Sequence, residues 1–313
     1  MPPRVIDCNY LDLPEVAAAY LVSDSGRAAF VDNNTTHAVP RLLAALADEG
    51  LRPDDVEYLI VTHVHLDHAG GTSALARACP DATVLCHPRA ARHLVDPSKL
   101  VASARVVYGD ETFEKLYGRI DPIDTARVRT LDDGAAVMLG ARTLRFLHTR
   151  GHANHHFCVL DEHDASIYTG DAFGLAYPML QGAGLFIFPS TSPTDFDPDE
   201  ARRSVRRIVE SGARRALPTH FGEVANLDEA AAQLLARLDE SAAVFDAAVK
   251  SDRAGSDLEH FCRERLEPMF ERAAAQRGLV LSAAQRDFLR LDLDLNAQGI
   301  AFVAERRRGA TRA

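Results

Sequence analysis

The chain of 313 residues contains no tryptophan and only five cysteines. The cysteines are odd in number, are spread along the sequence and form no CxxC pair, which argues against a disulfide framework and against a thiolate metal site. Most of them stand among apolar neighbours, so we expect buried free thiols in a reducing cytosol. They are Cys8, Cys79, Cys86, Cys158 and Cys262.

Long apolar runs and an excess of positive charge are also missing. No run of about 18 apolar residues occurs, so no membrane span is expected, and Met1–Asp7 lacks the apolar region of a secretory signal. Forty-five acidic residues against 35 basic ones give a net charge of −10, which disfavours nucleic acid as a partner. The one basic run, Arg306–Arg308, is expected to be a solvated tail. The sequence therefore predicts a cytoplasmic protein with neither a membrane nor a nucleic acid as its partner.

Hydrophobic patterning divides the chain near residue 225. Before it, short apolar strands alternate with amphipathic helices, which predicts an α/β domain over residues 1–225, for which the motifs described below indicate a catalytic role. Residues 226–313 show helical patterning alone. Capping signatures at Asn226, Ser256 and Ser282 predict the starts of three helices, and Pro268 is expected to kink or end the second. We expect this helical region to dock on the catalytic domain, bordering the pocket entrance or the interface of a homodimer.

Metal-ligand residues are concentrated in one segment, Thr62–Gly71, directly after an apolar strand. Residues two apart in extended backbone point to the same side, so His63 and His65 can reach one ion. The turn that follows can direct Asp67 and His68 towards a second ion. Imidazoles and carboxylates are ligands for zinc and similar cations. Exposed loop histidines are the alternative, but four ligand-type residues within six positions favour a metal site.

This segment resembles the HxHxDH signature of the metallo-β-lactamase superfamily, and the resemblance extends over roughly residues 15–225. Thr149–His152, Tyr168–Asp171 and Leu217–His220 are similar to the family's later motifs. The resemblance implies a four-layer αββα sandwich with two metal ions at one edge of its sheets and a C-terminal helical extension. It also implies that Asp171 bridges both ions. The implied ligands are His63, His65, Asp67, His68, His152, Asp171 and His220.

The chain departs from the usual pattern around His152. Arg150 stands where a proline is common, and Ala153-Asn154-His155-His156 replaces the frequent Thr-Pro-Gly-His. His155 and His156 either orient ligands or have no role, and the sequence leaves both possibilities open. Histidines 37, 87 and 148 are expected to be structural.

Two divalent cations a few ångströms apart lower the pKa of a bridging water, so that hydroxide is available at pH 7. We expect this hydroxide to cleave an ester, thioester or lactone, with Asp67 as the catalytic residue that orients it. Zinc is the expected metal, with iron or manganese as alternatives. The apolar loop Gly174–Pro198 suits an acyl substrate, or else packs on its own core.

Two other functions stay open at this point. An iron-dependent oxidative enzyme could use the same residues, and a catalytically weak member could act as a regulator through its helical region. The segment after Asp171 lacks the lysine-containing segment of glyoxalase II-like thioesterases. Ala172-Phe173-Gly174 also lacks the early tyrosine of acyl-homoserine lactonases, so the subfamily is not identified.

Overall fold

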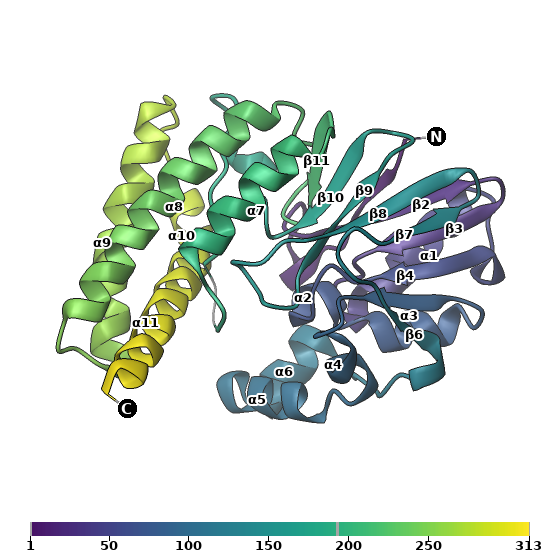
Figure 1. Cartoon of the computed structure of the whole chain (residues 1–313), viewed down its shortest axis with the longest axis horizontal. Helices are drawn as coiled ribbons and strands as arrows, with labels where there is room; N and C mark the ends of the chain where they lie inside the picture. The colour runs from purple at the N-terminus through teal and green to yellow at the C-terminus, as the bar shows by residue number, and fades with distance from the viewer. Residues whose placement is uncertain (1, 192–193, 313) are drawn as a thin grey trace.

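Two β-sheets face each other in the computed structural model, which describes residues 2–191 and 194–312 (Figure 1). Among these residues, the first sheet has six strands in the spatial order β1-β2-β3-β4-β5-β6, with bounds Arg4–Asp7, Ala18–Asp24, Arg27–Val31, Val56–Ile60, Thr83–Cys86 and Val128–Thr130. The second has the order β11-β10-β9-β8-β7, with bounds Arg215–Pro218, Ser166–Gly170, Phe157–Asp161, Arg142–His148 and Ala136–Leu139.

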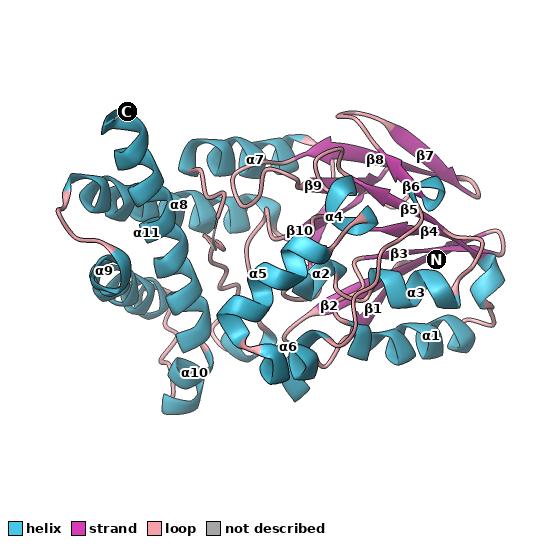
Figure 2. Ribbon diagram, turned by 90° about the horizontal axis from the view of Figure 1, so that it is seen from below, coloured by secondary structure: helices cyan, strands magenta, loops and turns pink. Residues whose placement is uncertain are grey.

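Helices cover the outer face of each sheet (Figure 2). Those of the first half of the chain are α1 (Val39–Asp48), α2 (Leu66–Ala69), α3 (Thr72–Ala78), α4 (Ala91–Val95), α5 (Ser98–Tyr108) and α6 (Asp110–Tyr117). Those of the second half are α7 (Pro198–Glu210), α8 (Leu227–Lys250), α9 (Gly255–Gln276), α10 (Ala283–Phe288) and α11 (Arg290–Arg312). Within the described residues, no helix is both long and apolar enough to cross a membrane.

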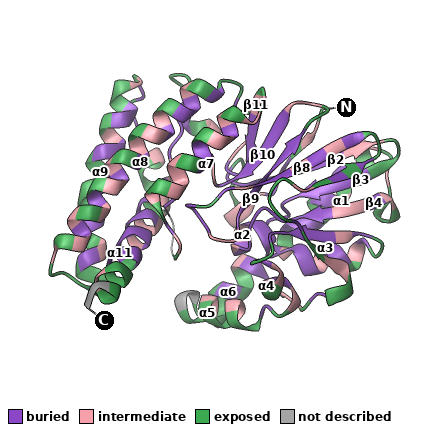
Figure 3. Ribbon diagram, in the orientation of Figure 1, coloured by how far each residue is buried: buried purple, intermediate pink, exposed green. Residues whose placement is uncertain are grey.

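Side-chain alternation along the strands produces the layers. In β2, Tyr20 and Val22 point into the core between the two sheets, whereas Leu21 points outwards to the layer of α1 and α3. Because strands that are buried on both faces need apolar residues at every position, these strands are nearly continuous apolar runs. Figure 3 shows most strand positions as buried. The predicted four-layer αββα sandwich is therefore confirmed.

The C-terminal helices share a hydrophobic core with the second sheet. Ile167 of β10, Leu234 of α8, Phe270 of α9 and Ile300 of α11 belong to the same buried cluster. The expected docking of the helical region on the catalytic part of the chain is thus confirmed. The boundary near residue 225 stays a prediction.

Two of the three expected helix caps form. The side chains of Asn226 and Ser282 accept hydrogen bonds from backbone N–H groups in the first turns of α8 and α10. The expected cap at Ser256 is wrong, because α9 begins one residue earlier, at Gly255. The N–H of Gly255 instead donates to the carboxylate of Glu305 on α11 at 2.7 Å, so a tertiary contact replaces the local cap.

Two further expectations about the helical region need correction. Pro268 does not end α9, which continues to Gln276, so of the two effects expected of this proline only the kink stays a prediction. Its position on an exposed side of the helix lets water satisfy the carbonyl that loses its N–H partner. The basic run is no tail, since it lies within α11, although Arg306 and Arg307 are exposed as expected. There Arg308 donates to the carbonyl of Ser251 at 2.6 Å.

Candidate metal centre

The seven predicted ligands meet where strands of both sheets end. His63 follows β4, Asp171 follows β10 and His220 follows β11, while His152 lies in the loop between β8 and β9. Because β10 and β11 are parallel neighbours, their carboxyl ends lie at the same edge. His65 has extended backbone directly before α2. The single helical turn of α2 then carries Asp67 and His68 to the same place.

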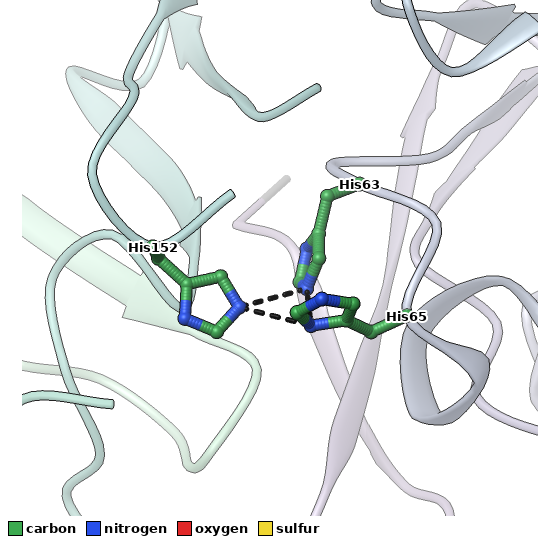
Figure 4. A group of neighbouring side chains, drawn as sticks. All are labelled: His63, His65 and His152. Atoms are coloured by element: carbon green, nitrogen blue, oxygen red, sulfur yellow. Dashed lines mark hydrogen bonds between the residues drawn. The ribbon is translucent and has the colours of Figure 1, made fainter. Parts of the chain in front are cut away.

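Three imidazoles converge on one point (Figure 4). The Nε2 atom of His63 lies 2.9 Å from Nδ1 of His65, and Nε2 of His152 lies 3.2 Å and 3.0 Å from these two atoms. Ligand atoms on one tetrahedral zinc lie about 3.3 Å apart, given Zn–N bonds of about 2.0–2.1 Å. The three nitrogens therefore have the spacing of ligands to a single cation.

A second group lies beside the first, and Asp171 joins the two. One carboxylate oxygen of Asp171, Oδ2, lies 3.5 Å from Nε2 of His152, whereas Oδ1 lies 3.2 Å from Nε2 of His68. Nε2 of His220 lies 3.4 Å from Oδ2 of Asp67 and 3.7 Å from Oδ1 of Asp171. The sequence-predicted residues are thus brought together as two adjacent groups, with one carboxylate between them.

Two buried polar atoms in this centre lack a hydrogen-bond partner among the described residues. They are Nε2 of His68 and Oδ1 of Asp171, which lie 3.2 Å apart but do not form a hydrogen bond with each other. A buried polar atom without a partner costs about 1–3 kcal/mol. A cation bound between such atoms would satisfy both of them. Together with the nitrogen and carboxylate donor set, this arrangement fits a pair of divalent metal ions.

Burial and mutual contact shift the pKa values in opposite directions. Burial alone would raise the pKa of the Asp67 and Asp171 carboxyls, but the adjacent imidazoles, His68 foremost, hold both pKa values below the usual range. Burial is the largest single influence and would lower the pKa of His68 and His220, but the carboxylates of Asp171 and Asp67 and the hydrogen bonds of the two rings together raise both pKa values. The carboxylates thus favour the protonated form of these two imidazoles in the absence of a cation, and metal binding would displace the proton from Nε2.

Asp32 is a functional residue that the sequence analysis missed. Its buried carboxylate accepts hydrogen bonds from Nδ1 of His68 at 2.9 Å and from the hydroxyl of Thr219 at 2.7 Å. It also accepts from the backbone N–H and the hydroxyl of Thr62. The sequence did contain a signal for Asp32. This carboxylate directly follows the apolar strand β3, which is the neighbour of the strand that leads to His63. Asp32 orients His68 so that Nε2 faces the centre.

Backbone carbonyls hold two other imidazoles. Nδ1 of His220 lies 2.8 Å from the carbonyl oxygen of Val16, and Nδ1 of His152 lies 3.3 Å from that of Ser190. A carbonyl can only accept, so Nδ1 carries the proton in both rings. Nε2 is then the atom that is free to bind a cation.

The histidines with open roles lie around the first group. His156 is buried, and its Nε2 accepts a hydrogen bond from the N–H of Asp171 at 3.3 Å, while its Nδ1 contacts the hydroxyl of Thr149. The ring of His155 is stacked against that of His63, with centroids 6.2 Å apart. His87 and His148 pair with each other, at a centroid distance of 4.1 Å, outside both groups of converging atoms.

The chain combines an αββα sandwich with a group of histidines and aspartates at the edge of its sheets. This combination is typical of a class of metal-binding proteins. The family model described as the metallo-beta-lactamase superfamily matches residues 13–220. The chain therefore belongs to the metallo-beta-lactamase superfamily.

Among curated relatives, the metallo-beta-lactamase fold-containing protein ST1585 of Sulfurisphaera tokodaii is 26% identical over 209 residues, which are 66% of this chain and 72% of that protein. The atrochrysone carboxyl ACP thioesterase of Aspergillus fumigatus is 26% identical over 197 residues, or 63% of this chain. The match spans 48% of that thioesterase, about half its length.

Solved structures show the same fold over nearly the whole chain. The crystal structure of ST1585 superposes with a TM-score of 0.65 at 20% identity, covering 95% of this chain and 97% of that one. The metallo-beta-lactamase family protein TTHA1429 of Thermus thermophilus superposes with a TM-score of 0.66 at 23% identity, covering 98% and 93%. These likenesses extend the shared fold into the C-terminal helical region.

Proposed function

We propose that this protein is a dinuclear metallo-hydrolase that cleaves an ester, thioester or lactone bond in a small molecule. The observation that carries the proposal is the carboxylate of Asp171, which lies between two groups of converging imidazole and carboxylate atoms. Zinc fits the nitrogen-rich donor set, and iron or manganese could use the same residues.

Each ion has its own residues in this proposal. One would be held by His63, His65 and His152, the other by Asp67, His68 and His220, and Asp171 would serve both. When bound, the two cations would supply Lewis acidity, which brings the pKa of water towards neutrality and stabilises negative charge on an acyl oxygen.

Asp67 is the proposed catalytic residue because of its exposure. Its side chain is 28% exposed, whereas those of His68, Asp171 and His220 are 0–6% exposed. It can therefore contact an incoming substrate or water. Its carboxylate stays ionised beside His68 and His220, as its lowered pKa indicates. As a base it would orient the attacking water and accept its proton, and it would then pass that proton to the leaving group.

The proposal that an acyl bond is cleaved is supported more by the relatives than by the side chains beside the metal centre. Most of the apolar side chains after Asp171, such as Phe173, Phe186 and Phe188, are buried in the core that is shared with the C-terminal helices. Of the two roles considered for this loop, core packing accounts for these residues. A thioesterase among the relatives supports an acyl substrate. The cytoplasmic location, the homodimer and the absence of nucleic-acid binding stay predictions.

Metal analysis and a hydrolysis screen on the same preparations test the proposal. We expect about two metal ions per chain and turnover of at least one class among thioesters, lactones and aryl esters. Saturation at one ion, or no turnover in any class by protein that carries two ions, would contradict it. Oxygen consumption by the iron-loaded protein without hydrolysis would instead support the oxidative alternative.

A further inference from the structure

Helix α11 holds the loop that lies against His152. The side chain of Asn296 donates through Nδ2 to the carbonyl of Pro189 at 3.3 Å and accepts through Oδ1 from the N–H of Thr191 at 2.6 Å. The hydroxyl of Thr191 donates in return to the carbonyl of Asn296 at 3.1 Å. Three hydrogen bonds therefore fix the residues on both sides of Ser190.

Ser190 transmits this contact to the centre. Its carbonyl oxygen lies 3.3 Å from Nδ1 of His152, whose Nε2 converges with His63 and His65. Asn296 is 9% exposed and Thr191 is 1% exposed, so water cannot readily replace the bonds between them. The direction of the Ser190 carbonyl thus depends on a side chain that is 105 residues away in sequence from Thr191.

A second contact fixes the same face of α11 near the other half of the centre. Asp292, four residues before Asn296 and hence on the same helix face, accepts a hydrogen bond from the hydroxyl of Tyr177 at 3.1 Å. The ring of Tyr177 lies with its centroid 6.1 Å from that of His220. Two anchors one turn apart therefore set the rotation and the position of α11 relative to the centre.

We propose that Asn296 is a positioning residue for the metal site of His63, His65 and His152, acting through Ser190 on the orientation and tautomer of His152. This inference rests on the metal site of the proposed function. With the Ser190 carbonyl held in place, Nδ1–H of His152 donates to it and Nε2 stays free to bind a cation. Without Asn296 the carbonyl can turn away, and the ring loses the contact that selects this tautomer.

A purely structural role would predict a different outcome, and the chain contains a matched control. Gln233 of α8 holds the same loop in the same manner, donating to the carbonyl of Leu185 at 2.9 Å and accepting from the N–H of Ile187 at 3.2 Å. Neither Leu185 nor Ile187 is among the residues that converge on the centre. Gln233→Ala therefore loosens the loop without releasing the carbonyl that contacts His152.

The test compares Asn296→Ala, Gln233→Ala and wild-type full-length protein. Zinc affinity is measured for both binding steps by competition with a chelator, and the free energy of unfolding of the metal-free protein is measured in urea. We expect Asn296→Ala to weaken one of the two steps about 10–100-fold, the scale for a contact that orients a ligand. Gln233→Ala should leave both steps unchanged. In the zinc-loaded protein, the His152 Nδ1 proton should exchange with water faster in Asn296→Ala than in wild type.

Each outcome of this comparison either supports or overturns the positioning role of Asn296. Unchanged zinc affinity in Asn296→Ala, or an equal loss in Gln233→Ala, would overturn the positioning role while leaving the proposed function intact. If Asn296→Ala does not fold, Thr191→Val, which removes only the hydroxyl bond to α11, decides in its place. It supports the role by weakening one zinc step severalfold and overturns it by binding as wild type does. Wild-type protein that binds no zinc would overturn the metal site itself, and this role with it.

Discussion

Nδ1 of His68 lies 2.9 Å from the carboxylate of Asp32, and both side chains are buried. The same carboxylate accepts hydrogen bonds from Thr62 and Thr219. Asp32 follows β3, Thr62 precedes His63 and Thr219 precedes His220. One buried carboxylate at the end of β3 thus connects two of the segments that carry the ligands, the one with His63 and His68 and the one with His220.

Replacing Asp32 with asparagine should weaken the second metal site. The amide keeps the shape of the carboxylate but turns one of its two acceptor atoms into a donor, so it cannot accept from all of its present partners. We expect about a 10–100-fold loss of affinity for one metal ion and about 1–3 kcal/mol of lost stability. Zinc competition and urea unfolding measure both. Asp24→Asn removes a carboxylate that accepts from the N–H of Ala141 at the surface, and it should leave zinc affinity unchanged.

Removing Asp171 should damage the centre more than removing a neighbouring histidine. Without its carboxylate, two cations would repel each other across a few ångströms, so Asp171→Ala should retain at most about one ion per chain. His155→Ala and His156→Ala should cost only about 10–100-fold in activity, because these rings contact the centre without joining either converging group. Measurements of metal content, hydrolytic rate and circular dichroism on the same preparations test this prediction. Near-wild-type turnover by folded Asp171→Ala would contradict the mechanism.

His87 should make stability depend on pH. Burial, followed by the charge of His148, lowers its pKa to about 3, and its Nδ1 accepts a hydrogen bond from the N–H of Arg89 at 3.0 Å. Between pH 6.5 and 3 the unfolded chain therefore binds a proton that the folded chain does not, and stability falls as the pH falls. The slope from this one group approaches about 1.4 kcal/mol per pH unit.

His87→Asn keeps an acceptor near Nδ1 but cannot titrate, so its stability should fall less steeply with acid. Urea unfolding of the metal-free proteins between pH 7 and 5 gives both slopes, and contributions common to both cancel in the difference. His260→Asn, which replaces an exposed histidine of α9, serves as the control and should follow wild type. Parallel curves for wild type and His87→Asn would show that the ring titrates alike in both states.

Leu234 should be essential for the docking of α8. It is 1% exposed and lies against Gly174, where a Cβ atom added to the glycine would meet Cδ2 of Leu234 and the carbonyl of Phe188. Leu234→Ala removes buried methyl groups and leaves a cavity, which costs about 2–5 kcal/mol of stability. Leu291→Ala on α11 is the control, because that side chain is 50% exposed and its loss should change stability by less than about 0.5 kcal/mol. Equal effects in urea unfolding would count against a shared core.

Several features could be predicted because they depend on neighbours in sequence. His63 and His65 share one side of an extended segment through the two-residue period of the backbone, and Asn226 and Ser282 cap helices that begin at the next residue. The order of the motifs then led to the family, which is confirmed over residues 13–220. Each of these signals lies within a few residues of the structure that it predicts.

Ser256 and Arg306–Arg308 show where local signals fail. Glu305 on α11 supplies the acceptor for the first turn of α9 in place of a cap by Ser256. Carbonyl oxygens of Ser251 and Thr194 bind two arginines of the run that was expected to be a solvated tail. In both cases the group that forms the hydrogen bond lies about 50 residues or more away in the chain. The neighbouring sequence therefore could not predict it.

By itself, the sequence determined the candidate metal ligands and the local turns on which they lie, because backbone periodicity and ligand chemistry are local properties. The tertiary structure decided which atom of each ligand faces the centre. Asp32 orients His68 across 36 residues, and Asn296, on a helix at the far end of the chain, binds Pro189 and Thr191 on either side of Ser190. Such hydrogen bonds form only after two sheets and their helices have docked, since burial excludes the water that would otherwise take their place.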